Sequence, residues 1–153
     1  MIAYMLSAAV MDRVVIDTNI FVSALLNADG APRAVLRLAL TREIMPVFGN
    51  ALFAEYEDVL GREALFAKSP LNSTERSALF EGLLCVSEWV RIYYLWRPNL
   101  ADEADNHVLE LAVAAGAAAI ITANKRDFAR ADLLFPGVRI VSASEFLDWR
   151  RQT

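Results

Sequence analysis

Residues 14–19, with the sequence Val-Val-Ile-Asp-Thr-Asn, decide the fold class of this chain. The first three are an unbroken β-branched run, which is typical of a strand that helices bury on both faces of a parallel sheet. Asp17, Thr18 and Asn19 follow at once, so three polar side chains stand at the carboxyl end of this predicted strand. Open parallel sheets bind ligands outside the carboxyl ends of their strands, and this segment is therefore also the first candidate for a functional site.

Short apolar strands alternate with helical segments along the rest of the chain. We expect strands at about 14–16, 45–48, 90–95, 118–122 and 138–141. We expect helices at about 20–27, 50–60, 63–68, 73–88 and 103–115, with another opening at Pro32 and a terminal one capped by Ser142 or Ser144. This alternation, with the right-handed sense of parallel crossovers, predicts a three-layer α/β/α domain with a central parallel sheet.

Two positions predict where helices begin and end. Asn50 is the expected N-cap of the helix at 50–60, because its side chain can accept a hydrogen bond from the free amides of the first turn. Gly116 follows the helix at 103–115, where a glycine with left-handed backbone commonly ends a helix.

The composition indicates one folded domain and limits its chemistry. Of the 153 residues, 56% are hydrophobic and 22% charged, which suits a single core and excludes a disordered chain. No apolar run approaches the roughly 18 residues that span a bilayer. One cysteine and one histidine exclude an intrachain disulfide, a cysteine-based zinc cluster and a histidine-rich metal site. Any metal must therefore be held mainly by carboxylates.

The charge pattern bears on nucleic-acid binding. The net charge of −4 argues against nonspecific binding of duplex nucleic acid through a broad basic surface. Thirteen of the 15 basic residues are arginine, whose planar fork binds two phosphate oxygens at once. A local phosphate-binding strip therefore stays open.

The first ten residues are apolar and precede a second methionine, Met11. We expect residues 1–10 to be an extension, either disordered or lying before the natural start, and residues 11–153 to form the domain. No basic residue precedes Arg13, so the start lacks the charged region of a signal peptide. We therefore expect a cytoplasmic protein without a membrane partner.

Asp105 is the most informative acid outside the opening segment. Val108, Leu109 and Ala112 follow it at spacings of three, four and seven residues, which places Asp105 in line with an apolar helical stripe. A lone buried carboxylate is unfavourable, so Asp105 would need a partner or a metal ion. The alternative is a capping carboxylate at the helix N-terminus, where the helix dipole favours negative charge.

The helix at 50–60 carries two candidate acids, Glu55 and Glu57, at opposite edges of its apolar stripe. Periodicity cannot choose between them, and a solvated flank is the simpler interpretation of either residue alone. His107 is expected on a solvated helix face, and Cys85, in an apolar run, is expected in the core.

Val15–Phe21, with the sequence Val-Ile-Asp-Thr-Asn-Ile-Phe, resembles the opening motif of the PIN-domain nucleases. An acid on the helix after the second strand, Asp105 before an apolar helix, and Ile121–Asn124 after a strand follow in that family's order. The resemblance extends from about Arg13 to the C-terminus and is closest to the VapC-like toxins of bacterial toxin–antitoxin pairs.

By this resemblance, Asp17, Glu55 and Asp105 match the catalytic, metal-binding acids of the family. The position of the family's fourth acid holds Asn124, whose amide oxygen can bind Mg²⁺ but brings no charge, so metal binding should be weaker. Asp127 is nearby and either substitutes as a metal ligand or caps the following turn.

The neighbouring polar residues take supporting roles in this scheme. Thr18 and Asn19 are expected to orient Asp17 and its loop through hydrogen bonds. Thr122 is expected to be part of the catalytic group, where it positions the attacking water or the fourth ligand. Because clustered carboxylates repel each other, such a site needs a cation between them.

The resemblance implies a Mg²⁺- or Mn²⁺-dependent ribonuclease that cleaves phosphodiester bonds in RNA and acts as the toxin of a toxin–antitoxin pair. Its implied partners are the RNA substrate, a cognate antitoxin and a second copy of the chain in a homodimer. Lys125, Arg126 and Arg130 flank the predicted site and form either an RNA-guiding strip or a solvated basic loop.

Two other classes of function compete with this one. The first is a PIN-fold binding module that has lost activity through Asn124. The second is an α/β phosphoacceptor or phosphatase domain with Asp17 as nucleophile. Phosphatases of that kind carry a second acid two residues after the first, and Asn19 stands at that position here.

Overall fold

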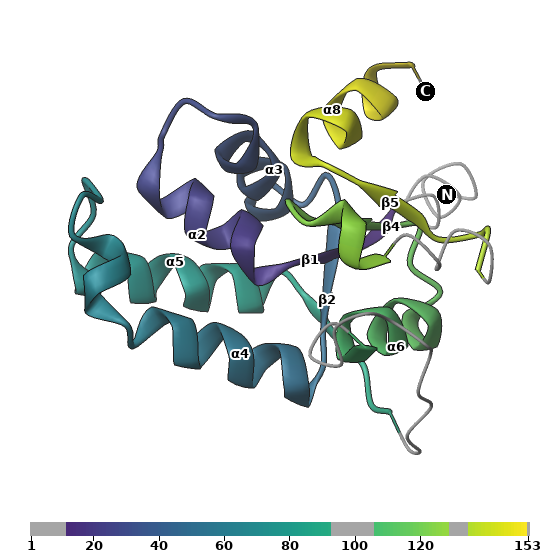
Figure 1. Ribbon diagram of the computed structural model, residues 1–153, viewed down its shortest axis with the longest axis horizontal. Helices are drawn as coiled ribbons and strands as arrows, with labels where there is room; N and C mark the ends of the chain where they lie inside the picture. Colours follow the sequence, from purple (N-terminus) through teal and green to yellow (C-terminus); the bar gives the residue numbers. More distant parts are fainter. Residues whose placement is uncertain (1–11, 93–105, 129–134, 153) are drawn as a thin grey trace, which may run out of the picture.

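A computed structural model describes residues 12–92, 106–128 and 135–152 (Figure 1). The strands in this part of the chain are β1 (Arg13–Ile16), β2 (Met45–Phe48), β3 (Glu88–Trp89), β4 (Ala119–Ile121) and β5 (Arg139–Val141). The helices are α2 (Thr18–Leu26), α3 (Ala31–Leu40), α4 (Asn50–Leu60), α5 (Ser73–Cys85), α6 (Asn106–Ala115) and α8 (Ala143–Gln152), with 3₁₀ turns η1 (Glu63–Phe66) and η3 (Lys125–Phe128). None of these helices is both long enough and apolar enough to span a membrane.

All of these strands are parallel, and their order in the sheet is β3-β2-β1-β4-β5. From β1 the chain runs outward to β2 and β3, and it then crosses back over β1 to form β4 and β5. The direction therefore reverses between β1 and β4, where Ile16 pairs with Ile121. Asp17 and Thr122 are the next residues of these two strands, so both lie at the switch point where open parallel sheets bind ligands.

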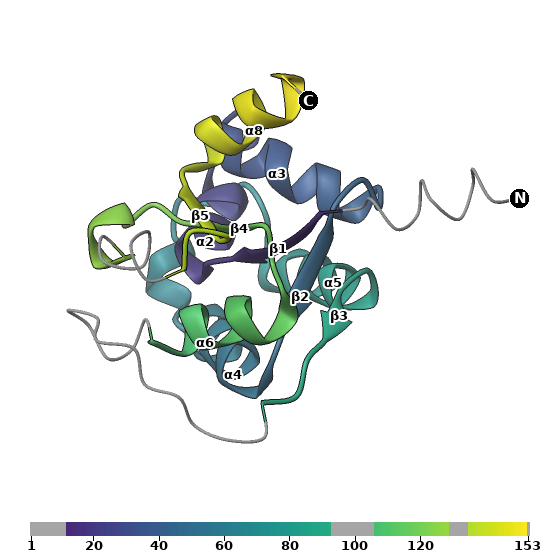
Figure 2. The same cartoon turned by 90° about the vertical axis from the view of Figure 1, so that its right-hand side faces the viewer.

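Helices cover both faces of the sheet. Figures 1 and 2 show α6 on one face and α2, α3, α4 and α5 on the opposite face. Val14, Val15 and Ile16 are at most 3% exposed, as the unbroken β-branched run predicts for a strand covered on both sides. The three-layer α/β/α fold with a central parallel sheet is thereby confirmed.

An aromatic cluster joins β1 to the helices beneath the switch point. Tyr56 of α4 is fully buried; its ring stacks on Phe80 at a centroid distance of 5.4 Å and meets Phe48 edge-on at 4.9 Å. Its hydroxyl donates a 2.7 Å hydrogen bond to the carbonyl of Ile16. This bond ties the middle of α4 to the residue before Asp17, and it fixes the position of the neighbouring Glu55.

Several local predictions are wrong in detail. The N-cap of α4 is Gly49, with no side-chain hydrogen bond, because Asn50 already has helical backbone. The third strand is Glu88–Trp89, two residues earlier than expected, and residues 93–95 lie outside the described part. Cys85 is exposed, because α5 ends there and turns it away from the core.

Other local predictions hold. Pro32 lies in the first turn of α3, Ser142 accepts a hydrogen bond from the backbone amide of Glu145 at the start of α8, and the helices at 20–27 and 63–68 are found as α2 and η1. Gly116 has φ of +63° directly after α6, which is the left-handed backbone that its position predicts.

Candidate functional site

Asp17 lies where β1 passes into α2. Its backbone amide donates to the carbonyl of Ile121 at 3.0 Å, which continues the pairing of β1 with β4 by one residue. The side chain is the N-cap of α2 and accepts from the amide of Thr18 at 2.8 Å. The end of the strand and the start of the helix thus hold one carboxylate at the switch point.

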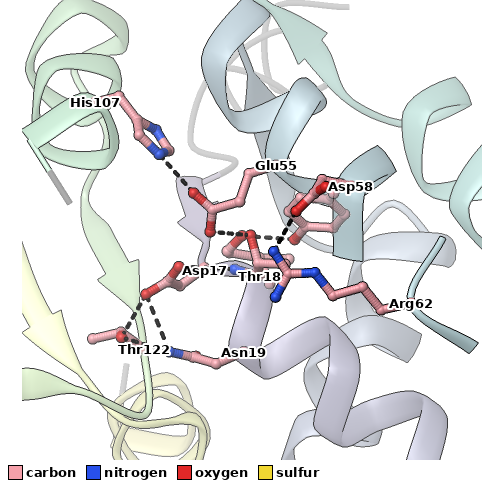
Figure 3. Close-up of polar contacts among 10 residues, drawn as sticks. Asp17, Thr18, Asn19, Glu55, Asp58, Arg62, His107 and Thr122 are labelled. Carbon is pink, nitrogen blue, oxygen red and sulfur yellow. Dashed lines mark hydrogen bonds and ion pairs between the residues drawn. The ribbon is translucent and has the colours of Figure 1, made fainter. Parts of the chain in front are cut away.

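The second carboxylate oxygen of Asp17 accepts two further hydrogen bonds (Figure 3). The hydroxyl of Thr122 donates at 2.7 Å and the side-chain amide of Asn19 at 3.3 Å. Asp17 is 4% exposed, and burial raises the pKa of its carboxyl above the usual value, against the lowering effect of the Thr122 hydrogen bond. The nearby charge of Glu55 raises this pKa further, so two acids face one another across the site.

Glu55 reaches the same site from α4. Its Oε1 accepts a 2.7 Å hydrogen bond from the hydroxyl of Thr18, and its Oε2 lies 2.7 Å from Nε2 of His107. The hydrogen bond from His107 lowers the pKa of Glu55, against the opposing effect of its partial burial. Glu57, which periodicity could not separate from Glu55, is exposed and lines a groove between α4 and α5 instead.

The prediction that His107 is solvated is wrong. Its side chain is 22% exposed, Nε2 contacts Glu55, and Nδ1 is buried with no hydrogen-bond partner in the described part of the chain. The prediction failed because it judged His107 against a single apolar stripe, whereas α6 buries residues on several sides: Val108, Leu109 and Leu111 are all fully or almost fully buried. A helix buried on most of its circumference has no single stripe against which a polar residue can be judged.

Thr122 and Asn19 form hydrogen bonds between the ends of β1 and β4. Thr122 is completely buried, and its hydroxyl also accepts from the backbone amide of Asn124 at 3.0 Å. The side-chain oxygen of Asn19 accepts from the amide of Ala123 at 3.1 Å. Thr18 therefore contacts Glu55, and Asn19 contacts Asp17 and the end of the neighbouring strand.

The residues after β4 are less enclosed. Asn124 is exposed, and Asp127 is half-buried within η3, where its backbone amide donates to the carbonyl of Asn124 at 3.1 Å. The ammonium group of Lys125 forms an ion pair with Glu145 at 2.8 Å, while Arg126 is exposed. Lys125 thus links η3 to α8 through this ion pair, so its charge is already partnered within the protein.

Two predicted site residues, Asp105 and Arg130, lie outside the described residues. Asp105 stands two residues before His107 in the sequence. Within 12–92, 106–128 and 135–152, no group of three or more histidine, cysteine, aspartate or glutamate side chains is placed to hold a metal ion.

The donor chemistry of the site nevertheless suits a hard divalent cation. Asp17 and Glu55 are carboxylates, and Mg²⁺ prefers oxygen ligands while keeping several waters. Burial and the charge of Glu55 both raise the pKa of Asp17, and a cation bound between the two acids would oppose both effects.

These features define a class: a parallel α/β domain with an acidic site at the switch point of its sheet. Residues 13–126 match the PIN domain family, a span that includes every described strand except β5. The chain belongs to the PIN-domain family. No curated protein shows significant sequence similarity to it.

Family membership gives the coarse function. PIN domains are generally nucleases that act on nucleic acid, and membership of the family suggests a nuclease-type function for this chain. PIN-domain nucleases generally use divalent metal ions, which agrees with the oxygen-rich donor set at the switch point.

Proposed function

We propose that this protein is a Mg²⁺- or Mn²⁺-dependent endoribonuclease and that Asp17, Glu55 and Asp105 are its catalytic, metal-binding acids. The observation that carries the proposal is the burial of Asp17 at the end of β1, close to the charge of Glu55, at a position where an uncharged asparagine could cap α2 equally well. Asn124 completes the ligand set, or Asp127 does so in its place.

The chain's own residues prepare this site in three ways. Thr122 and the amide of Thr18 hold one Asp17 oxygen each, so the carboxylate cannot rotate. The hydroxyl of Thr18 joins Glu55 to the start of α2, the helix that Asp17 caps. The chemistry that a divalent ion supplies at such a site is activation of water and neutralisation of charge on the phosphate.

The direct test is cleavage of single-stranded RNA by the purified protein in Mg²⁺ or Mn²⁺. Asp17→Asn should reduce the rate by about 100-fold or more, the scale of losing one group that stabilises charge in the transition state. Glu57→Gln is the matched control, since it removes an exposed acid two residues from Glu55 and should leave the rate unchanged. Undiminished cleavage in chelator would rule out metal dependence.

We further propose that the protein is the VapC-like toxin of a toxin–antitoxin pair and that it forms a homodimer. Its expression should arrest growth, Asp17→Asn should relieve the arrest, and co-expression of a cognate antitoxin should do the same. Light scattering should give the mass of a dimer. Normal growth on expression of the active protein would exclude the toxin role.

A non-catalytic binding module is the second candidate, and Asn124 favours it. An amide at the position of the family's fourth acid leaves the site one negative charge short, which weakens binding of a divalent ion. RNA binding without cleavage in any divalent ion would support this candidate over the nuclease.

A further inference from the structure

Glu55 is held more firmly than its exposure requires. Its side chain is 34% exposed, so water alone could solvate the carboxylate. Holding a glutamate in one rotamer costs conformational entropy. Yet both oxygens have a partner at 2.7 Å, Thr18 on one side and His107 on the other. Distances this short are typical of hydrogen bonds to a charged acceptor.

His107 contributes the contact that reaches across the site. Thr18 comes from the start of α2, whereas His107 comes from α6, which covers the opposite face of the sheet (Figures 1 and 2). The Glu55–His107 contact therefore bridges the layers on either side of the switch point. Nδ1, at the other end of the ring, is buried.

We propose that His107 is a positioning residue: its Nε2–H donates to Oε2 of Glu55 and so keeps the Glu55 carboxylate aimed at Asp17. This role deepens the nuclease function proposed above, because the aimed carboxylate is one of the proposed metal ligands. Thr18 alone holds only Oε1 and leaves the carboxylate free to pivot about that contact.

The first test measures affinity for Mn²⁺ by calorimetry on the full chain. Loss of a hydrogen-bond partner of a metal-binding side chain typically weakens the metal by about 10- to 100-fold, and we expect this of His107→Ala. His107→Gln, which keeps a side-chain N–H donor, should recover part of the affinity. Arg62→Ala is the control, since Arg62 pairs with Asp58 on α4 and contacts neither Glu55 nor His107 in the structure.

A double-mutant cycle separates positioning from general damage to the fold. If His107 acts through Glu55, His107→Ala should have no further effect on Mn²⁺ affinity in a Glu55→Ala background. Equal effects in both backgrounds would overturn the proposal. Thermal unfolding of each variant identifies any that fail to fold.

The second test needs neither metal nor activity. The chain has one histidine, so its imidazole nitrogen resonances require no assignment by mutation. In metal-free protein the proton should reside on Nε2, and Glu55→Ala should shift that resonance. A ring protonated only on Nδ1, or an Nε2 resonance insensitive to Glu55→Ala, would refute the hydrogen bond.

The two tests distinguish failure of this proposal from failure of the nuclease function. If the protein binds no divalent ion but shows the Nε2–H resonance, the hydrogen bond from His107 to Glu55 stands and the proposed metal site is wrong. Protein that binds Mn²⁺ equally well with and without His107 retains the metal site and loses the positioning role.

Discussion

Replacement of Thr122 by valine tests how the site tolerates a buried acid. The two side chains have nearly the same shape, and Thr122 is completely buried, so Thr122→Val removes a hydroxyl without opening a cavity. Three hydrogen bonds are lost: the 2.7 Å bond to Asp17, the 3.0 Å bond from the backbone amide of Asn124 and a 3.5 Å bond from the side-chain amide of Asn19, which also donates to Asp17. Because Asn124 is exposed, water can replace the second bond, and the first determines the effect.

The size of the effect depends on the charge of Asp17. A hydrogen bond to an ionised group contributes about 1.5–3 kcal/mol, and one between neutral groups contributes about 1 kcal/mol. At neutral pH we expect Thr122→Val to lower the free energy of unfolding by about 2–3 kcal/mol. In a domain of this size that loss corresponds to a fall in Tm of roughly 4–12 °C.

The pH dependence follows from the sign of the pKa change. Thr122 lowers the pKa of Asp17, which burial has raised above 3.8, so its removal raises that folded-state pKa further. An acid with a raised folded-state pKa destabilises the protein at pH above that value. The penalty disappears once the acid is protonated in both the folded and the unfolded state. The destabilisation by Thr122→Val should therefore shrink to about 1 kcal/mol as the pH falls through the pKa of Asp17.

Urea unfolding of metal-free protein, at neutral pH and at about pH 3, below the ordinary carboxyl pKa of 3.8, measures both values. Thr74→Val on α5 is the control, because Thr74 is exposed and such substitutions change stability by less than about 0.5 kcal/mol. A loss of stability that is the same at both pH values would refute the electrostatic reasoning. It would mean that Asp17 is not ionised in the folded protein at neutral pH.

Two further substitutions test other parts of the structure. Asn124→Asp should tighten Mn²⁺ binding, because it adds a negative ligand to the proposed site. The rate of RNA cleavage should then rise most at low metal concentration. An unchanged affinity for Mn²⁺ would indicate that Asp127 already fills this role. Gly116→Ala should destabilise the fold by about 1–2 kcal/mol in urea unfolding, because φ is +63° and the new methyl group meets no atom within 4 Å, so backbone strain alone acts. A neutral effect would contradict the left-handed backbone at Gly116.

Much of the fold could be predicted because strands and helices have different hydrophobic periods. Every residue at 14–16 is apolar, and these residues of β1 are buried. This one pattern therefore predicted both the strand and its place in a sheet covered by helices on both faces. The same reasoning misplaced the third strand, because β3 has only two residues and ends at Trp89, which is 48% exposed. A short edge strand buries too little of either face to leave a pattern.

A site residue could be predicted only where its position in the sequence, without knowledge of its neighbours in space, indicated a functional role. Asp17 follows a strand directly, so its place at the sheet edge required no knowledge of tertiary packing. Glu55 and Glu57 could not be separated, because the choice depends on which edge of α4 meets α2. His107 was missed because its partner, Glu55, lies 52 residues earlier in the sequence, and no local pattern records that contact.

Among the described residues, the two acids Asp17 and Glu55 are the stronger argument for a bound cation, because no group of three side chains is placed there to hold a metal ion. Asp17 is held by Thr18, Asn19 and Thr122, which are all uncharged donors, and burial still raises its pKa. Glu55 adds a second acid, and the nearest lysine after β4 is already paired with Glu145. An asparagine would cap α2 as well as Asp17 does and would not carry the charge. A buried acid whose pKa is raised by burial suits a role outside folding, and the divalent cation proposed above would supply the opposite charge.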